Sequence, residues 1–171
     1  DPLQPNQGWS VGAGALWTGQ RTSTGVAQYG EAFGPVALAN YRDFKFNIYS
    51  EEGLVFGSRL DAAKQGLGAD YDFARVTLSA IRYWRVGATA HQTVHVFGDT
   101  GLNWDGPRSV RNFTLGGVGG LRGYQRGYRE GNAYFRVGTE WARPVFKPWI
   151  RTVVIAETGN VYAQPNEFEP G

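Results

Sequence analysis

Two histidines are the residues of this sequence whose type and spacing first suggest chemistry. His91 and His95 lie four positions apart, which on a helix would place both imidazoles on one face, where they could hold a metal ion. On a strand, the same spacing separates them by about 13 Å, because a strand advances about 3.3 Å per residue. The residues around them alternate as in a strand, so we expect two polar-face histidines and no metal site.

Three carboxylates could serve in acid–base chemistry: Asp72, Glu140 and Glu157. No nucleophile elbow, Ser-His-Asp set or His-Glu-x-x-His motif accompanies them, so structural ion pairs are the better interpretation. The glycines at 116–120 could cradle a phosphate, but no Lys-Ser or Lys-Thr follows and no helix pattern begins there. We therefore expect a protein that is not an enzyme and uses no cofactor or metal.

The composition favours a single domain made of many short strands. Glycine accounts for 25 of the 171 residues, about twice its usual share, and aromatic residues reach 15%. The net charge of +2 is scattered along the chain without a basic tract, so we expect no nucleic-acid partner. The sequence has no cysteine, which excludes disulfides and thiol chemistry.

Alternation of apolar and polar residues indicates strands along most of the chain. Such segments of about 9–11 residues are what a strand needs to cross a bilayer. We count about eight, joined by tight turns at 51–53 and 86–87 and by a long loop at 98–130. The expected strands are residues 9–17, 25–33 (the weakest), 42–50, 54–61, 71–86, 88–97, 131–145 and 149–158.

The two faces of these strands favour a membrane environment. The mean hydropathy of −0.38 and the lack of an apolar run of about 18 residues exclude a helical span, but transmembrane strands also have low mean hydropathy. In the strand at 71–86, Val76 and Leu78 alternate with Arg75 and Thr77. Because charged residues occupy the polar faces and tryptophans end the apolar ones, we favour a transmembrane barrel over a soluble lipocalin-like barrel or sandwich.

Aromatic residues extend this interpretation. For the strand at 42–50, we expect an apolar face of Phe44, Phe46 and Ile48 opposite Asp43 and Lys45. Three tryptophans could line a ligand pocket but equally suit the membrane interface, and these are Trp17, Trp84 and Trp141.

The segment between the two clearest strands carries a distinctive motif. Residues 112–124 read Asn-Phe-Thr-Leu-Gly-Gly-Val-Gly-Gly-Leu-Arg-Gly-Tyr, and a later strand contains Ala-Glu-Thr-Gly-Asn-Val at 156–161. This combination resembles the BamA, TamA and FhaC superfamily of outer-membrane insertases and translocators, also called the bacterial surface antigen family. In that family a late loop carries Val/Leu-Arg-Gly-Phe/Tyr after a Leu-Gly-Gly run, and the later strand has Asp where Glu157 stands. The functional loop motif is Gly116, Gly117, Gly119, Gly120, Leu121, Arg122, Gly123 and Tyr124.

The resemblance implies a long loop that folds into the barrel lumen. Arg122 at its tip would be costly to bury unless it met a carboxylate on the inner wall, and its planar guanidinium suits a bidentate pair. Glu140 lies on the polar face of its strand and matches an acidic position of the family, and Glu157 is the second candidate. We expect Arg122 to be paired in the lumen with Glu140, Glu157 or both, the alternative being a solvated loop cation.

The fold that the resemblance implies is all-β, an antiparallel transmembrane β-barrel. Residues 1–171 would form one outer-membrane barrel domain or a fragment of a 16-stranded barrel, with no POTRA module. The start at Asp1, without Met or a signal core, suggests a processed form or an excised piece. With an extracellular motif loop and eight strands, both Asp1 and Gly171 would lie on the extracellular side.

The function that the resemblance implies is insertion or translocation of polypeptides in the outer membrane of a Gram-negative bacterium, or of an organelle of bacterial descent. The expected partners are outer-membrane lipid, polypeptide substrates, and a second copy or the remaining strands of the barrel. Three alternatives stay open: a barrel that anchors a separate enzyme domain such as a patatin-like lipase, a miniature oligomerising barrel, and a soluble ligand-binding barrel.

Overall fold

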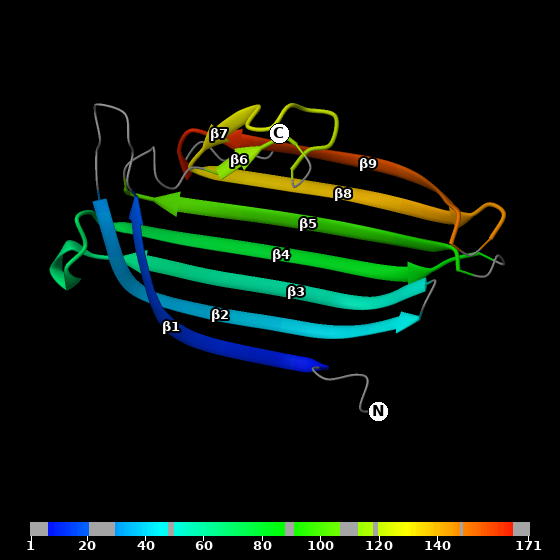
Figure 1. Ribbon diagram of the computed structural model, residues 1–171, viewed down its shortest axis with the longest axis horizontal. Coiled ribbons are helices and arrows are strands. Elements are labelled where there is room, and N and C mark those ends of the chain that lie inside the picture. The colour runs from blue at the N-terminus through cyan, green and yellow to red at the C-terminus, as the bar shows by residue number, and fades with distance from the viewer. Residues whose placement is uncertain are drawn as a thin grey trace.

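Seven long strands form one antiparallel sheet in the computed structural model of the chain (Figure 1). The structure describes residues 7–20, 30–47, 50–87, 91–106, 113–117, 120–147 and 149–165. The sheet consists of β1 (Gly8–Gln20), β2 (Gly30–Asn47), β3 (Ser50–Ala63), β4 (Phe73–Arg85), β5 (Thr93–Trp104), β8 (Ala133–Pro144) and β9 (Arg151–Tyr162), in that order. Two short strands, β6 (Phe113–Leu115) and β7 (Arg129–Gly131), pair separately, and a 3-10 turn, η1 (Gln65–Leu67), follows β3. The all-β antiparallel fold is thus confirmed.

One face of the sheet, called here the outer face, exposes a continuous apolar surface. Successive side chains of a strand point to opposite faces, so the in-register pairing collects the apolar positions of all seven strands on one side. A water-exposed patch of this size is unusual, whereas lipid is the solvent in which a barrel exposes such a band. Its large exposed members are Trp9, Val11, Trp17, Phe33, Leu60, Leu78, Trp84, Val96, Trp104, Val137 and Val154.

Tryptophans mark both borders of the outer face. Trp9 and Trp17 end the apolar face of β1, and they are 67% and 68% exposed. Trp17 lies eight positions after Trp9, about 26 Å at about 3.3 Å per residue, which matches the apolar band of about 25 Å in outer-membrane barrels. Trp84 near the end of β4 and Trp104 at the end of β5 lie at opposite borders of the same face.

The opposite face, called here the inner face, carries the charged residues and the β6–β7 hairpin. Asp99 of β5 lies directly opposite Arg136 of β8, and Asp61 of β3 opposite Arg75 of β4. Where the hairpin covers this face, Leu115 and other apolar residues form a small buried cluster. The inner face therefore combines ion pairs with one packed site under the hairpin.

Two segments expected as separate strands are one strand. β2 runs from Gly30 to Asn47 and joins residues 30–33 to residues 42–47, which gives seven strands in the sheet where about eight were expected. Residues 25–29 lie outside the described part. Gly34 suggests in the sequence that a strand is interrupted there. In the structure, it allows the backbones of β2 and β3 to approach closely. A Cβ at Gly34 would lie 1.9 Å from the carbonyl oxygen of Ala62.

The turn expected at residues 51–53 is wrong, because these residues belong to β3, whose Ser50 pairs with Asn47. The expectation that Phe44 belongs to the apolar face of residues 42–50 is also wrong. Its ring lies on the inner face, opposite Gly53, with its centroid 5.2 Å from that of Tyr83. Glycine on the neighbouring strand leaves room for this ring, which periodicity within one strand does not reveal. Ile48 lies outside the described residues, and the side chain of Phe46 is not described.

The strand expected at 88–97 is displaced towards the C-terminus. β5 begins at Thr93 and continues to Trp104, so residues 98–104 belong to the sheet and not to the long loop. His91 lies in the preceding turn with a φ of 64°, while His95 lies in β5 on the inner face. Residues 88–90 and 107–112 lie outside the described part.

The short connections between strands lie at one end of the sheet, and the long connections lie at the other end. The connections after β2, β4 and β8 span residues 48–49, 86–92 and 145–150, whereas those at the other end span residues 21–29, 64–72 and 105–132. Outer-membrane barrels have short periplasmic turns and longer extracellular loops. Because the sheet of described strands has seven members, β1 begins and β9 ends at opposite ends of it (Figure 1). Asp1 and Gly171, which were expected to lie on one side, are outside the described residues. Within the described residues, no helix is suited to crossing a membrane.

Candidate functional site

A hairpin built on β6 and β7 carries the glycine-rich motif. Phe113 pairs with Gly131 and Leu115 with Arg129, so these strands form the stem and residues 116–128 the tip. The tip is closed by backbone hydrogen bonds, of which the Gly117 N–H donates to the Tyr124 carbonyl at 3.0 Å. Figure 1 shows the hairpin beside β8 and β9.

Two glycines allow this compact tip. Gly116 has a φ of +113°, a conformation that side chains disfavour, and a Cβ there would lie 2.2 Å from the Gln125 carbonyl oxygen. A Cβ at Gly120 would lie 2.5 Å from the Gly116 nitrogen. The motif therefore needs glycine for close backbone approach. Gly119 lies outside the described residues.

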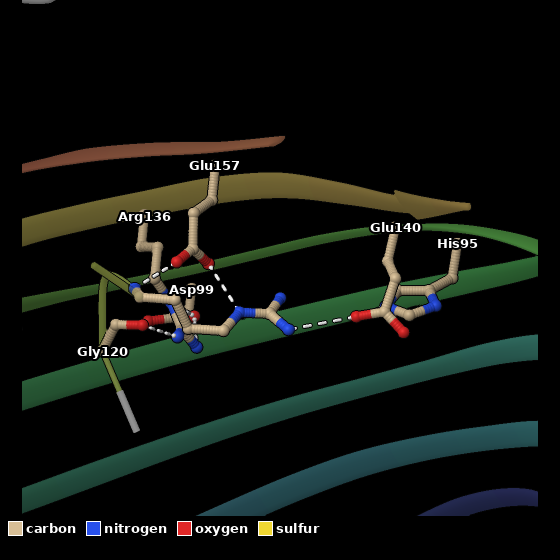
Figure 2. Close-up of polar contacts among 7 residues, drawn as sticks. His95, Asp99, Gly120, Arg136, Glu140 and Glu157 are labelled. Atoms are coloured by element: carbon tan, nitrogen blue, oxygen red, sulfur yellow. Dashed lines mark hydrogen bonds and ion pairs between the residues drawn. The ribbon is translucent and has the colours of Figure 1, made fainter. Parts of the chain in front are cut away.

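The guanidinium of Arg122 lies between two carboxylates on the inner face, those of Glu140 and Glu157, both of which Figure 2 labels. Its Nη1 donates to Glu140 Oε2 at 3.1 Å, and its Nε lies 3.5 Å from Glu157 Oε2. The backbone N–H of Arg122 also donates to Glu157 Oε1. Glu140 belongs to β8 and Glu157 to β9, so one residue of the hairpin contacts two adjacent strands of the sheet.

Burial is unequal within this site. The side chain of Glu157 is 6% exposed, that of Glu140 22% and that of Arg122 41%. Glu157 Oε2 makes no hydrogen bond, and Arg122 Nε at 3.5 Å is its nearby cation. A buried carboxylate that loses its cation is destabilised by the full cost of its desolvation, whereas Arg122 can be solvated at its exposed side. Glu157 is thus the member that depends most on the pair.

Apolar packing holds the residue before Arg122. Leu121 is 6% exposed and packs with Leu115 of the stem and Val161 of β9, with Tyr134 at the edge of the cluster. Tyr124, in contrast, is 50% exposed, and its ring centroid lies 4.8 Å from that of Tyr128 of the same hairpin, with the two rings tilted by 44°. The tip thus buries Leu121 and leaves Tyr124 half exposed.

The structure brings together only part of the candidate set from the sequence. Arg122, Glu140 and Glu157 meet, and His95 Nε2 lies 3.9 Å from Glu140 Oε2. Asp72 lies elsewhere, in the connection between β3 and β4, where it accepts the Gln65 N–H at 2.7 Å. Among the described residues, no cluster of His, Asp or Glu is arranged to hold a metal ion.

Two further anchors of the hairpin were missed in the sequence. Arg136 pairs with Asp99 and donates to the Gly120 carbonyl, and Asp99 was assigned to the loop because β5 was ended too early. Phe113 of the stem is 6% exposed and lies 4.6 Å from the Tyr134 ring, with the Arg75 guanidinium 4.3 Å from its centroid. Arg136 alternates with Phe135 and Val137 on β8, and this polar-face position was the available signal.

The comparisons with known proteins agree with this architecture. No curated protein sequence matches the chain at a significant level. The model of the Omp85 superfamily domain matches residues 33–171, which is more than half of the chain and includes the hairpin and both carboxylates. Omp85 proteins are outer-membrane barrels of the protein insertion and translocation family. With its antiparallel sheet, its lipid-suited outer face and this match, the chain belongs to the Omp85 superfamily.

Proposed function

We propose that this chain is the membrane part of a machine that inserts or translocates polypeptides at the outer membrane, and that the docked Leu121-Arg122-Gly123-Tyr124 tip is its working element. The observation that carries the proposal is the contact of Arg122 with carboxylates from two adjacent strands, Glu140 and Glu157. An insertase needs a sheet that is stable in lipid and that can also change its conformation. A hairpin fixed by a small number of charged contacts meets that need.

The pairing of β8 with β9 beside the site supports this role for the docked tip. β8 and β9 pair along their whole length, from Ala133 with Tyr162 to Pro144 with Arg151. Because Arg122 contacts β8 and β9 together, we propose that docking of the tip fixes the register of these two strands.

The proposal is tested by reconstituting the full-length protein in liposomes with an unfolded outer-membrane barrel as substrate. The measured quantity is the rate at which substrate becomes protease-protected and heat-modifiable. Arg122→Gln removes the cation from the buried Glu157, a change worth about 1–3 kcal/mol that lowers the equilibrium constant for docking by about 5-fold to 150-fold. We expect a loss of insertion rate of the same order.

Arg85→Gln is the matched control, because it also breaks a cross-strand Arg–Glu pair. Arg85 contacts Glu52 at 2.9 Å between β3 and β4, strands that do not carry the Arg122 site, and both side chains are largely exposed. Its rate should match that of the unmodified protein. A folded Arg122→Gln protein with unchanged insertion activity would contradict the proposal, and it would favour a barrel that only anchors another domain.

A further inference from the structure

Arg136 lies beside the docked tip but outside the glycine-rich motif. Its Nη2 and Nε lie 2.7 Å and 2.8 Å from Asp99 Oδ1, and its Nη1 donates to the Gly120 carbonyl oxygen at 2.8 Å (Figure 2). The guanidinium carbon also lies 5.2 Å from the centroid of the Phe97 ring. One planar group thus connects β5, β8 and the hairpin.

The two polar contacts of Arg136 use different edges of the guanidinium. Asp99 is its direct partner in the register of β5 and β8, so the ion pair fixes the direction of the side chain across the inner face. Nη1 then remains to contact the hairpin backbone. A guanidinium offers five donors in a rigid planar arrangement and can contact both acceptors at once. A lysine ammonium is a point charge that would contact one acceptor or the other.

The acceptor on the hairpin is a carbonyl that needs a donor. Gly120 is buried, and its tight approach to Gly116 leaves no space for a side chain. A buried backbone carbonyl without a partner is destabilising, so the conformation of the tip at Gly120 depends on a donor from the sheet. Arg136 supplies it.

The contact of Arg136 falls immediately before the Arg122 site. The Gly120 carbonyl is held by Arg136, Leu121 is packed in the apolar cluster, and the Arg122 N–H donates to Glu157. Consecutive peptide groups are therefore fixed by side chains of β8 and β9. Displacement of Gly120 would move the Arg122 backbone away from the carboxylates.

We propose that Arg136, oriented by Asp99, is a positioning residue that sets the hairpin backbone so that Arg122 reaches Glu140 and Glu157. This role rests on the proposed function of the docked tip. Arg136 acts through Gly120 and Arg122 and needs no contact with the polypeptide substrate. Docking is then held at two coupled points, and loss of either one releases the tip.

The test is the mobility of a nitroxide attached at Gln125→Cys, an exposed position of the tip in a sequence without cysteine. Two variants are compared in the full-length protein in lipid. Arg136→Gln replaces the guanidinium by a shorter, neutral amide, and Arg136→Thr/Asp99→Thr also leaves no unpaired charge and restores a cross-strand pair of β-formers. Arg59→Gln is the control, because it breaks an inner-face pair with Asp61 at 2.8 Å that does not involve the hairpin.

The expected result is that the ratio of mobile to immobile label rises about tenfold in both Arg136 variants and stays unchanged in Arg59→Gln. A second label at Leu67→Cys, in the β3–β4 connection, should keep its spectrum, which separates release of the tip from general loosening. An immobile tip in the folded Thr/Thr variant would overturn the inference even if Arg136→Gln did not fold.

Failure of this inference is distinguishable from failure of the proposed function. If the tip stays immobile without Arg136 while Arg122→Gln still abolishes insertion, the positioning role is wrong and the function stands. If the Arg136 variants release the tip and insertion continues at the normal rate, the positioning role holds and the docked tip is not the working element.

Discussion

The outer and inner faces of the sheet are stabilised by different physical effects. On the outer face, Val11 is 81% exposed and Trp17 68%, and such residues make few contacts within the described chain, so lipid must supply their apolar environment. On the inner face, Arg136 meets Asp99 and Arg122 meets Glu140 within hydrogen-bonding distance. The outer face thus requires only apolar character, whereas the inner face requires particular partners. The same strands carry both requirements at alternating positions.

The largest effect should come from placing a charge on the outer face. Leu78→Arg, near the middle of β4, should lower the free energy of unfolding from lipid by about 2–4 kcal/mol, because the charge would lie in the apolar band. Thr77→Arg changes the neighbouring residue, which faces inward, and should cost much less. Urea unfolding in lipid vesicles, followed by tryptophan fluorescence, measures both. Equal losses would contradict the assignment of the two faces.

A smaller and asymmetric effect is expected within the Arg122 site. Arg122→Gln leaves the carboxylate of Glu157 buried without its cation, and should weaken docking by about 1–3 kcal/mol. Glu157→Gln leaves an arginine that is 41% exposed and can be solvated, so its effect should be smaller. Trypsin cleavage after Arg126, a site of the tip that all these variants keep, reports the released fraction of the folded protein. The double variant should be cleaved more slowly than Arg122→Gln, and faster cleavage would contradict the asymmetry.

The smallest effect is expected for the exposed pair between β3 and β4. Arg85 and Glu52 have side chains that are 62% and 47% exposed, and pairs of this kind contribute about 0–1 kcal/mol. Arg85→Gln should therefore change the unfolding midpoint in urea only slightly. A loss as large as that of Leu78→Arg would show that ion pairs of the sheet are not ranked by their burial.

Much of the fold followed from the sequence because alternation is a local signal. The apolar face of β4 was predicted correctly from periodicity, since Val76 and Leu78 alternate with Arg75 and Thr77 and lie on the outer face. The signal was misleading at Phe44, where Gly53 on the next strand makes room for a ring on the inner face. Pairing between strands is not encoded in the period of one strand.

The candidate site was likewise predicted only in part from the sequence. Arg122, Glu140 and Glu157 stood out because of their charge, their polar-face positions and the motif around them, and the structure brings them together. Arg136 and Asp99 were not proposed as a pair, because their contact depends on the register of β5 with β8 and on where β5 ends. The register between strands that are distant in the sequence cannot be predicted from a single sequence.

The docking of the hairpin on the inner face is tested most directly by disulfide cross-linking in native membranes. Leu121 and Val161 pack in one buried cluster, whereas Val154 of β9 lies on the outer face and is exposed. Since the sequence has no cysteine, introduced pairs can be oxidised selectively. Docking predicts rapid cross-linking of Leu121→Cys with Val161→Cys and none of Leu121→Cys with Val154→Cys. Equal yields for the two pairs, or no cross-link with Val161→Cys, would contradict a hairpin docked on the inner face.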